Sequence, residues 1–136
     1  MIKRTVAMIV LMVLGQHLLA QDWILLSEDE SQKNYIKSSF ESVKTLDSGG
    51  KLITVWTKDI FTKFPLDGKD YSNASVQTLW VIDCKKRKVN IPKMVVYSSH
   101  GDILAKQTVK EVTWLDVEQN TGQELVLIKA CELMAK

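Results

Sequence analysis

The chain has 136 residues, of which 46% are hydrophobic and 25% are charged, and its formal net charge is +2. This length suits a single domain with one core. The small net charge excludes the strongly basic balance that drives nonspecific binding to nucleic acid or anionic lipid.

The first twenty residues have the layout of a secretory signal peptide. Lys3 and Arg4 form a short positive region, and an apolar run follows that is shorter than the roughly 18 to 20 residues of a membrane span. We expect cleavage between Ala20 and Gln21, which leaves one domain over residues 21–136; an uncleaved membrane anchor is the alternative. Cleavage removes two of the 18 basic residues, so that 16 remain against 16 acidic residues.

Export sets the expected compartment of the mature chain. Gln21 stands where a lipoprotein would carry its lipid-bearing cysteine, and no later apolar stretch approaches the length of a membrane span. We therefore expect a periplasmic, surface-located or secreted product that is not a lipoprotein and has no transmembrane segment after processing.

Short apolar runs alternate with polar turns in the first half of the mature chain. Residues 23–26 and 33–37 predict a pair of strands, and residues 38–47 favour a helical turn before the breaker Gly49-Gly50. Residues 51–61 are rich in β-branched and aromatic side chains, which predicts a longer strand.

The strongest strand pattern in the chain lies at residues 75–84. Both of its faces are mostly apolar in the middle, which predicts a central strand that is covered on both sides. Residues 64–72 precede it and contain Pro65 and the pair Asp67-Gly68, so that we expect a loop there.

Two further strands are predicted after this one. Residues 89–97 form a strand that lies at an edge or is bulged at Pro92, because proline has no amide hydrogen to donate. Residues 103–109 predict another strand, and Trp114-Leu115 is expected to tether the connecting loop to the core.

The C-terminus changes to a helical pattern. Thr121 and Glu124 fit a capping box, in which Thr121 caps the amide three residues on and Glu124 reaches back. Residues 125–134 follow as a helix, with Leu127 and Cys131 on one face. The predicted fold is α+β: a small antiparallel sheet of about six strands with the C-terminal helix packed on it.

The two cysteines, Cys84 and Cys131, are expected to form a disulfide, as an even pair usually does in an oxidising compartment. Cys84 shares a strand face with Trp80, and Cys131 shares a helix face with Leu127. Packing of that helix face on the Trp80 face would bring the sulfurs together and link the helix to the central strand. Two buried free thiols are the alternative.

The mature chain carries no recognisable catalytic constellation. His100, its one histidine, lies in a predicted hairpin turn and is expected to be solvated. The sequence has no activated nucleophile, no clustered metal ligands and no phosphate-binding loop. We therefore predict that the chain is not an enzyme and uses no metal or cofactor.

Two features are candidates for contact with a partner. Lys85, Lys86, Arg87 and Lys88 give four successive positive charges at a predicted hairpin tip, which either dock an acidic polymer or protein surface or only keep the hairpin solvated. Trp56 lies on a mixed strand face, where a partly exposed indole can anchor a partner. Export makes nucleic acid an unsuitable partner.

A set of features recurs in order over residues 22–133: Asp22-Trp23, Tyr35-Ile36 before Ser38-Ser39, Val55-Trp56, Tyr71, Asp83-Cys84, Trp114 and a terminal helix with Cys131. In this order they resemble the surface-adhesin protein E family of Gram-negative bacteria. The resemblance implies an antiparallel sheet tied to a C-terminal helix, and non-enzymatic binding. For the namesake it implies adhesion to host matrix proteins and association into dimers.

We therefore predict an exported, adhesin-like binding module that engages a protein or an acidic polymer of the host matrix or cell envelope. The alternative is a periplasmic inhibitor or envelope-maintenance factor that acts on a cell-wall enzyme. Recovery of an endogenous enzyme from a periplasmic extract would favour this alternative.

Overall fold

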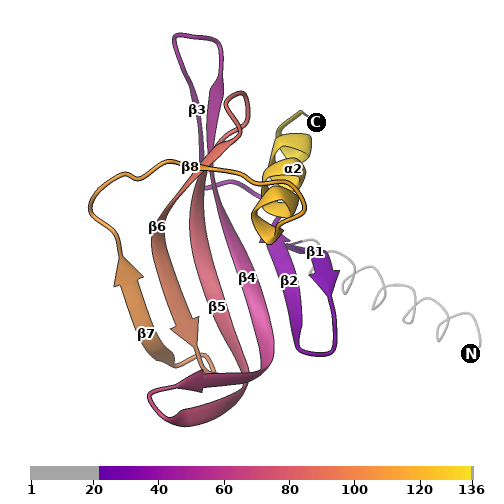
Figure 1. Cartoon of the computed structure of the whole chain (residues 1–136), viewed down its shortest axis with the longest axis vertical. Helices are drawn as coiled ribbons and strands as arrows, with labels where there is room; N and C mark the ends of the chain where they lie inside the picture. Colours follow the sequence, from indigo (N-terminus) through magenta and orange to yellow (C-terminus); the bar gives the residue numbers. More distant parts are fainter. Residues whose placement is uncertain (1–21, 136) are drawn as a thin grey trace, which may run out of the picture.

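The computed structural model describes residues 22–135, which form one antiparallel sheet and a C-terminal helix (Figure 1). The main strand order is β1-β2-β4-β5-β6-β7, while β3 pairs with β4 and β8 pairs with β6. The bounds are β1 Trp23–Glu28, β2 Gln32–Lys37, β3 Ser42–Thr45, β4 Lys51–Leu66, β5 Lys69–Asp83, β6 Lys88–Tyr97, β7 Ile103–Thr108, β8 Leu115–Asp116 and α2 Gly122–Ala135. The predicted fold class is confirmed, with two short strands added to the expected six. The predicted cleavage site at Ala20 and Gln21 lies outside the described residues.

A long hairpin of β4 and β5 forms the middle of the sheet. The two strands pair in one register from Leu52 opposite Asp83 to Leu66 opposite Lys69, with a gap in the pairing at Thr62 and Asn73, where Asn73 has φ of 57°. Asp67 and Gly68 are the two turn residues, with φ of 52° and 75°, and positive φ at both positions defines the type I′ turn that Asp-Gly favours. The loop predicted at 64–72 is therefore wrong, because these residues are the strand ends that flank this turn.

Residues 38–47 contain a short strand and not the expected helical turn. Ser42–Thr45 (β3) pairs with the first residues of β4 in a second hairpin, which projects from the upper end of the sheet in Figure 1. Its side chains are exposed. Because no face of this strand is buried, its sequence shows no alternation of apolar and polar residues from which a strand could be predicted.

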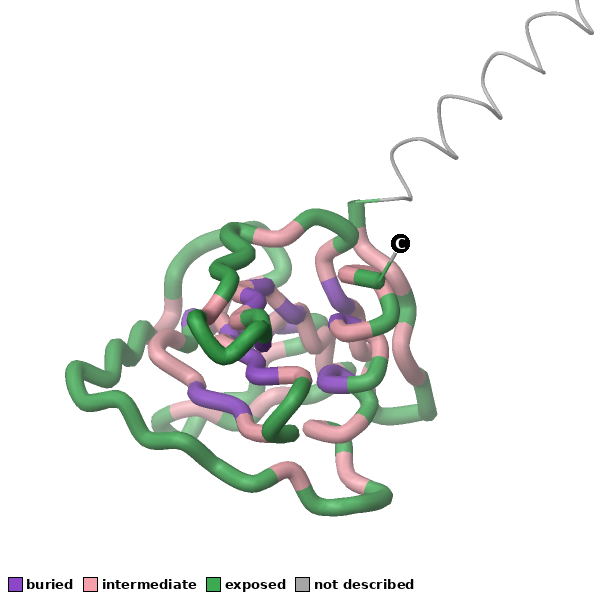
Figure 2. The backbone as a smooth tube through the Cα atoms, turned by 90° about the horizontal axis from the view of Figure 1, so that it is seen from above, coloured by how far each residue is buried: buried purple, intermediate pink, exposed green. Residues whose placement is uncertain are grey.

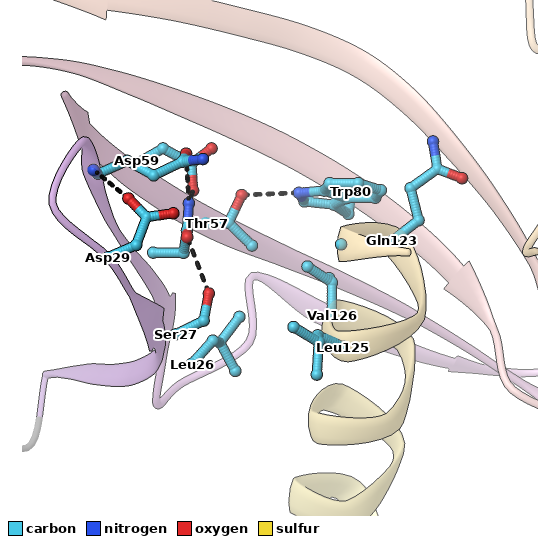
Figure 3. A pocket seen from close by; sticks show the side chains of 12 residues that line it. Leu26, Ser27, Asp29, Thr57, Asp59, Trp80, Gln123, Leu125 and Val126 are labelled. Atoms are coloured by element: carbon cyan, nitrogen blue, oxygen red, sulfur yellow. Dashed lines mark hydrogen bonds between the residues drawn. The ribbon is translucent and has the colours of Figure 1, made fainter. Parts of the chain in front are cut away.

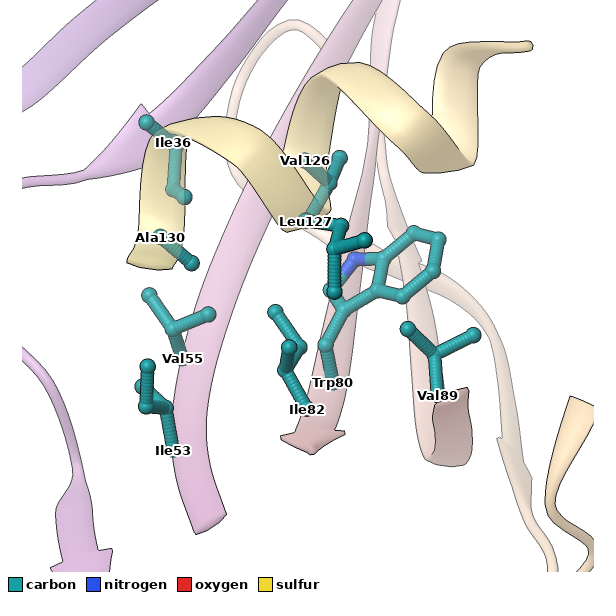
Figure 4. Close-up of a cluster of buried hydrophobic side chains, with 9 residues drawn as sticks. All are labelled: Ile36, Ile53, Val55, Trp80, Ile82, Val89, Val126, Leu127 and Ala130. Carbon is teal, nitrogen blue, oxygen red and sulfur yellow. The ribbon is translucent and has the colours of Figure 1, made fainter. Parts of the chain in front are cut away.

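The hydrophobic core lies between α2 and one face of the sheet (Figure 4). Val126, Leu127 and Ala130 of the helix are buried against this face. The strands contribute Ile36, Ile53, Val55, Trp80, Ile82 and Val89 to the same cluster. Figure 2 shows the buried residues in the interior, with exposed residues around them.

The predicted disulfide between Cys84 and Cys131 is confirmed, and it joins the residue after β5 to the second half of α2. The start of α2 also has contacts close to the predicted capping box of Thr121 and Glu124. The Glu124 amide donates to Thr121 Oγ1 over 3.3 Å, and Glu124 Oε1 accepts from the Asn120 amide over 3.2 Å. The cap and the bond fix the helix at its start and in its second half.

Pro92 sits at a bulge, which was one of the two predicted possibilities. In β6, Lys93 pairs with Leu79 and Asn90 pairs with Val81, so that Ile91 and Pro92 together face the single residue Trp80. The strand lies between β5 and β7 and is therefore not an edge. The bulge places the residue without an amide donor where the ladder is already interrupted.

Trp114 does not tether its loop to the core, contrary to the prediction. Its side chain is 39% exposed, whereas that of Trp80 is 8% exposed. The segment is held instead by backbone pairing of β8, in which Leu115 pairs with Val89 at the end of β6. Trp114 lies at the surface beside Leu46 and Leu52.

Candidate functional site

The face of the sheet opposite α2 is the main candidate site, and we call it the open face. Alternation along β4 directs Val55 and Thr57 towards the helix side and Trp56 and Lys58 to the other side. The prediction that β5 is covered on both sides is therefore wrong, because α2, the one helix of residues 22–135, packs on a single face. Pairing register assigns to the open face Trp23, Tyr35, Lys37, Trp56, Lys58, Gln77, Leu79, Lys93, Val95, Tyr97 and Lys106.

Lys58 is the centre of a cluster of cation and aromatic rings on this face. Its Nζ lies 4.4 Å from the ring centroid of Trp23 and 5.5 Å from that of Tyr35. Lys37 Nζ lies 5.9 Å from the same Trp23 ring. Cross-strand pairing of Trp23 with Lys37 and of Tyr35 with Lys58 produces this arrangement. Each contact lies within the range in which a ring face attracts a cation.

The environment of Lys58 is unusual for a lysine. Its side chain is half-buried, and burial lowers the pKa of its ammonium below the ordinary value. None of Lys37, Lys58, Lys93 and Lys106 is ion-paired with a carboxylate of residues 22–135. Three of these lysines, Lys37, Lys58 and Lys93, lie over aromatic rings, and none of the four has an ion-pair partner in this part of the chain.

Trp56, predicted as a partner contact, is half-buried on the same face. Its indole Nε1 donates to Glu41 Oε1 over 3.0 Å, and Lys93 Nζ lies 6.0 Å from its ring centroid. These contacts fix the plane of the ring and leave it partly accessible. A fixed aromatic ring loses little conformational entropy on binding, which suits an anchor residue.

The open face is hollowed beside Lys58. A depression of about 500 Å³ is lined by Lys58, Gln77 and Tyr97 together with the serines of the β6–β7 turn, Ser98 and Ser99. These side chains offer an ammonium, an amide and hydroxyl groups, which donate hydrogen bonds to anionic or hydroxylated ligands. The depression therefore extends the same donor-rich surface.

The basic hairpin at 85–88 is largely engaged within the molecule. Arg87 Nη2 pairs with Glu124 Oε2 at 2.9 Å, and Lys88 Nζ pairs with Asp116 Oδ1 at 3.8 Å. Lys85 Nζ donates to the carbonyl of Ser48 over 3.4 Å. The hairpin begins just after the end of β5, and Lys85 is six residues beyond the Leu79 that pairs with Trp56. The structure does not bring this hairpin together with Trp56.

Lys86 is the member of the hairpin whose exposed ammonium has no hydrogen bond or ion pair within residues 22–135.

His100 is exposed in the β6–β7 turn, where its amide donates to Ser98 Oγ over 3.2 Å. Among the residues that the structure describes, no group of three His, Cys, Asp or Glu side chains is arranged to hold a metal ion. Over the same residues, no helix is long and apolar enough to cross a membrane.

Comparison with known families identifies the chain. The family described as Surface-adhesin protein E matches residues 23–132. The chain belongs to the surface-adhesin protein E family. The crystal structure of protein E from non-typeable Haemophilus influenzae is similar to this chain, with a TM-score of 0.49 and 13% identity over 82% of this chain and 76% of that chain. No curated protein matches the chain.

Membership of the surface-adhesin protein E family makes this an adhesin-like surface-binding protein. Sequence reasoning identified Trp56 but missed Trp23, Tyr35 and Lys58. The signal that could have found them is the alternation of Trp56 with Lys58 on one face of the strand at 51–61. The contact between Lys58 and Trp23 spans three strands, and only the register of β1, β2 and β4 brings the two residues together.

Proposed function

We propose that this member of the surface-adhesin protein E family is an exported, non-enzymatic binding module that engages an acidic polymer or an acidic protein surface through the open face. The observation that carries the proposal is Lys58, which is held between Trp23 and Tyr35 with no carboxylate partner in the described residues. A half-buried lysine without a counter-charge gains most from an anion that is supplied by a ligand.

The chemistry of the open face suits a sulfated or carboxylated polymer. Lysine ammonium groups bind anionic groups as mobile point charges, and they tolerate the irregular spacing of such polymers. The rings of Trp23, Tyr35 and Trp56 offer flat apolar surfaces on which the carbon faces of sugar rings can stack. Binding of this kind weakens as salt concentration rises, because exposed charges are screened.

Export is part of the proposal. Cleavage between Ala20 and Gln21 would place the module in the periplasm, on the surface or in the medium, without a lipid anchor. N-terminal sequencing of the product from a bacterial host tests this point. A mature chain that begins at or next to Gln21 supports it, and a chain that retains its leader in the membrane fraction contradicts it.

The direct test is binding to a heparin oligosaccharide and to immobilised matrix proteins. Lys58→Gln combined with Lys93→Gln should weaken binding about tenfold, which corresponds to ~1.4 kcal/mol. The matched control removes two exposed lysines outside the open face, Lys51→Gln and Lys110→Gln, with the same change in net charge. Equal affinities of the two variants would refute the proposed face.

A further variant tests the basic hairpin. Alanine at all four positions from Lys85 to Lys88 should leave binding within twofold of the parent protein if the open face is the site. A greater loss for this variant than for the Lys58 and Lys93 variant would move the site to the hairpin. Thermal unfolding of each variant separates lost binding from lost structure.

A further inference from the structure

A second concave site lies on the helix side of the sheet, away from the open face (Figure 3). It is a pocket of about 410 Å³ between the first turn of α2 and strands β1, β2, β4 and β5. One wall is apolar, with Leu26, Trp80 and Val126, and the other is polar, with Asn34 and Asp59. The pocket therefore combines a surface for an alkyl chain with a surface for a polar end group.

A hydrogen-bond chain fixes the polar wall. Ser27 Oγ donates to Asn34 Oδ1 over 2.8 Å, and Asn34 Nδ2 donates to Asp59 Oδ1 over 2.6 Å. Asp59 Oδ2 accepts no hydrogen bond from residues 22–135. No side-chain oxygen in this part of the chain is both sealed from solvent and unpartnered, so Asp59 Oδ2 keeps some exposure, and Asp59 is one of the residues that line the pocket. The carboxylate is thus oriented through one oxygen and free at the other.

The apolar wall is fixed as well. The Trp80 Nε1 donates to Thr57 Oγ1 over 2.7 Å, which holds the indole plane at the side of the pocket. The helix cap described above anchors the first turn of α2, from which Val126 and Leu125 reach the rim. Both walls are therefore formed before a ligand arrives, which lowers the entropic cost of binding.

The charge of the pocket is negative. Asp29 and Asp59 line it, and no lysine or arginine does. Asp29 Oδ1 already accepts from the Ser31 hydroxyl and from two amides, which lowers the pKa of Asp29. Asp59 has a single donor and no cation, and burial raises the pKa of its carboxyl despite the bond from Asn34. A half-buried carboxylate in this condition is stabilised by a cation from outside.

We propose that this pocket receives a lysine or arginine side chain of a partner polypeptide, with the alkyl stem against Trp80 and Leu26 and the cationic group at Asp59 Oδ2. Charge complementarity selects the occupant, because the lining offers oriented carboxylate oxygen and no positive side chain. The stem of either side chain buries readily along apolar surface while its head stays polar. The pocket thus adds a specific polypeptide contact that does not involve the open face.

The probe for this site is the blocked peptide acetyl-Gly-Arg-Gly-amide, with the neutral isostere acetyl-Gly-citrulline-Gly-amide as its control. The processed protein is labelled with ¹⁵N-tryptophan, and the indole resonance of Trp80 reports on the pocket. We expect a saturable shift with the arginine peptide and at least tenfold weaker binding of the citrulline peptide. Equal affinity for the two peptides would overturn the proposal.

Two variants and one control locate the contact. Asp59→Asn keeps the oxygen that accepts from Asn34 and removes the charge, so it should weaken binding of the arginine peptide at least tenfold. Asp102→Asn, which removes the charge of an exposed turn carboxylate, should leave the affinity unchanged. Gly122→Leu should block the pocket sterically, since a Cβ there meets no atom within 4 Å and the side chain can occupy the rim. Unchanged affinity in both pocket variants would refute the site.

Two further outcomes have a defined meaning. Putrescine that binds as tightly as the arginine peptide would show a small-amine site and overturn the polypeptide occupant. Peptide-induced shifts confined to Trp23 and Trp56 would move the contact to the open face and overturn the pocket. Binding of heparin oligosaccharide, measured separately, is unaffected by either result, so that this proposal and the proposed function fail independently.

Discussion

Replacement of both Cys84 and Cys131 by alanine should lower the free energy of unfolding by about 4 kcal/mol, as the chain-entropy relation gives for a loop of this length. The bond closes a loop between residues that are 47 apart in sequence. Val126, Leu127 and Ala130 hold the helix on the sheet through core contacts of their own, so we expect the loss to arise mainly in the unfolded chain. For a domain with ~5–15 kcal/mol in total, the variant should fold but with much reduced stability.

Urea unfolding followed by tryptophan fluorescence measures this difference, because Trp80 is buried beneath α2. The midpoint should fall, and the dependence of the unfolding free energy on urea should steepen, since an uncrosslinked chain exposes more surface when it unfolds. Wild-type protein under a reducing agent is the matched control and should coincide with the double variant. A double variant within ~0.5 kcal/mol of the oxidised wild type would refute the reasoning.

Three further predictions concern single side chains. Leu127→Ala, which empties a buried position on the helix, should cost ~2–5 kcal/mol by denaturant unfolding, whereas Ile128→Ala on the exposed side should cost less than ~1 kcal/mol. Burial raises the pKa of Asp59 in the folded state. At pH values between the unfolded and the folded pKa, the folded protein therefore binds more protons than the unfolded chain. The free energy of unfolding falls as pH rises through the folded pKa. Asp59→Asn should therefore be at least as stable as wild type at pH 7, with the difference vanishing towards acid pH; a variant that is less stable at pH 7 would contradict this. Gly68→Ala, at φ of 75°, should cost ~1 kcal/mol in thermal unfolding, whereas Gly122→Ala in the first turn of α2 should be neutral or stabilising.

The elements with a strong local pattern could be predicted from the sequence. The runs at 51–61 and 75–84, the terminal helix and the pairing of Cys84 with Cys131 follow from periodicity and from the number of cysteines. The strand extensions around Asp67-Gly68 do not follow from the local sequence, because Pro65 is typical of a loop and yet lies in the paired end of β4. The exposed β3 has no apolar period, so only its pairing with β4 reveals it.

The candidate site was predicted only in part for a related reason. Trp56 was singled out from its own strand, whereas the cluster around Lys58 depends on the register of β1, β2 and β4. The basic hairpin stood out in the sequence because its charges are contiguous. Folding pairs Arg87 with Glu124 and Lys88 with Asp116, which neither the local sequence nor its periodicity indicates.

The most direct test of the proposed binding face uses the four tryptophans as reporters of four places on the molecule. In a titration of ¹⁵N-tryptophan-labelled protein with heparin oligosaccharide, the indole resonances of Trp23 and Trp56 should shift together and saturate. Those of Trp80, beneath the helix, and Trp114, beside Lys86 and Lys88, should stay in place. A shift of Trp114 without Trp23 and Trp56 would contradict the account and place the polymer at the basic hairpin.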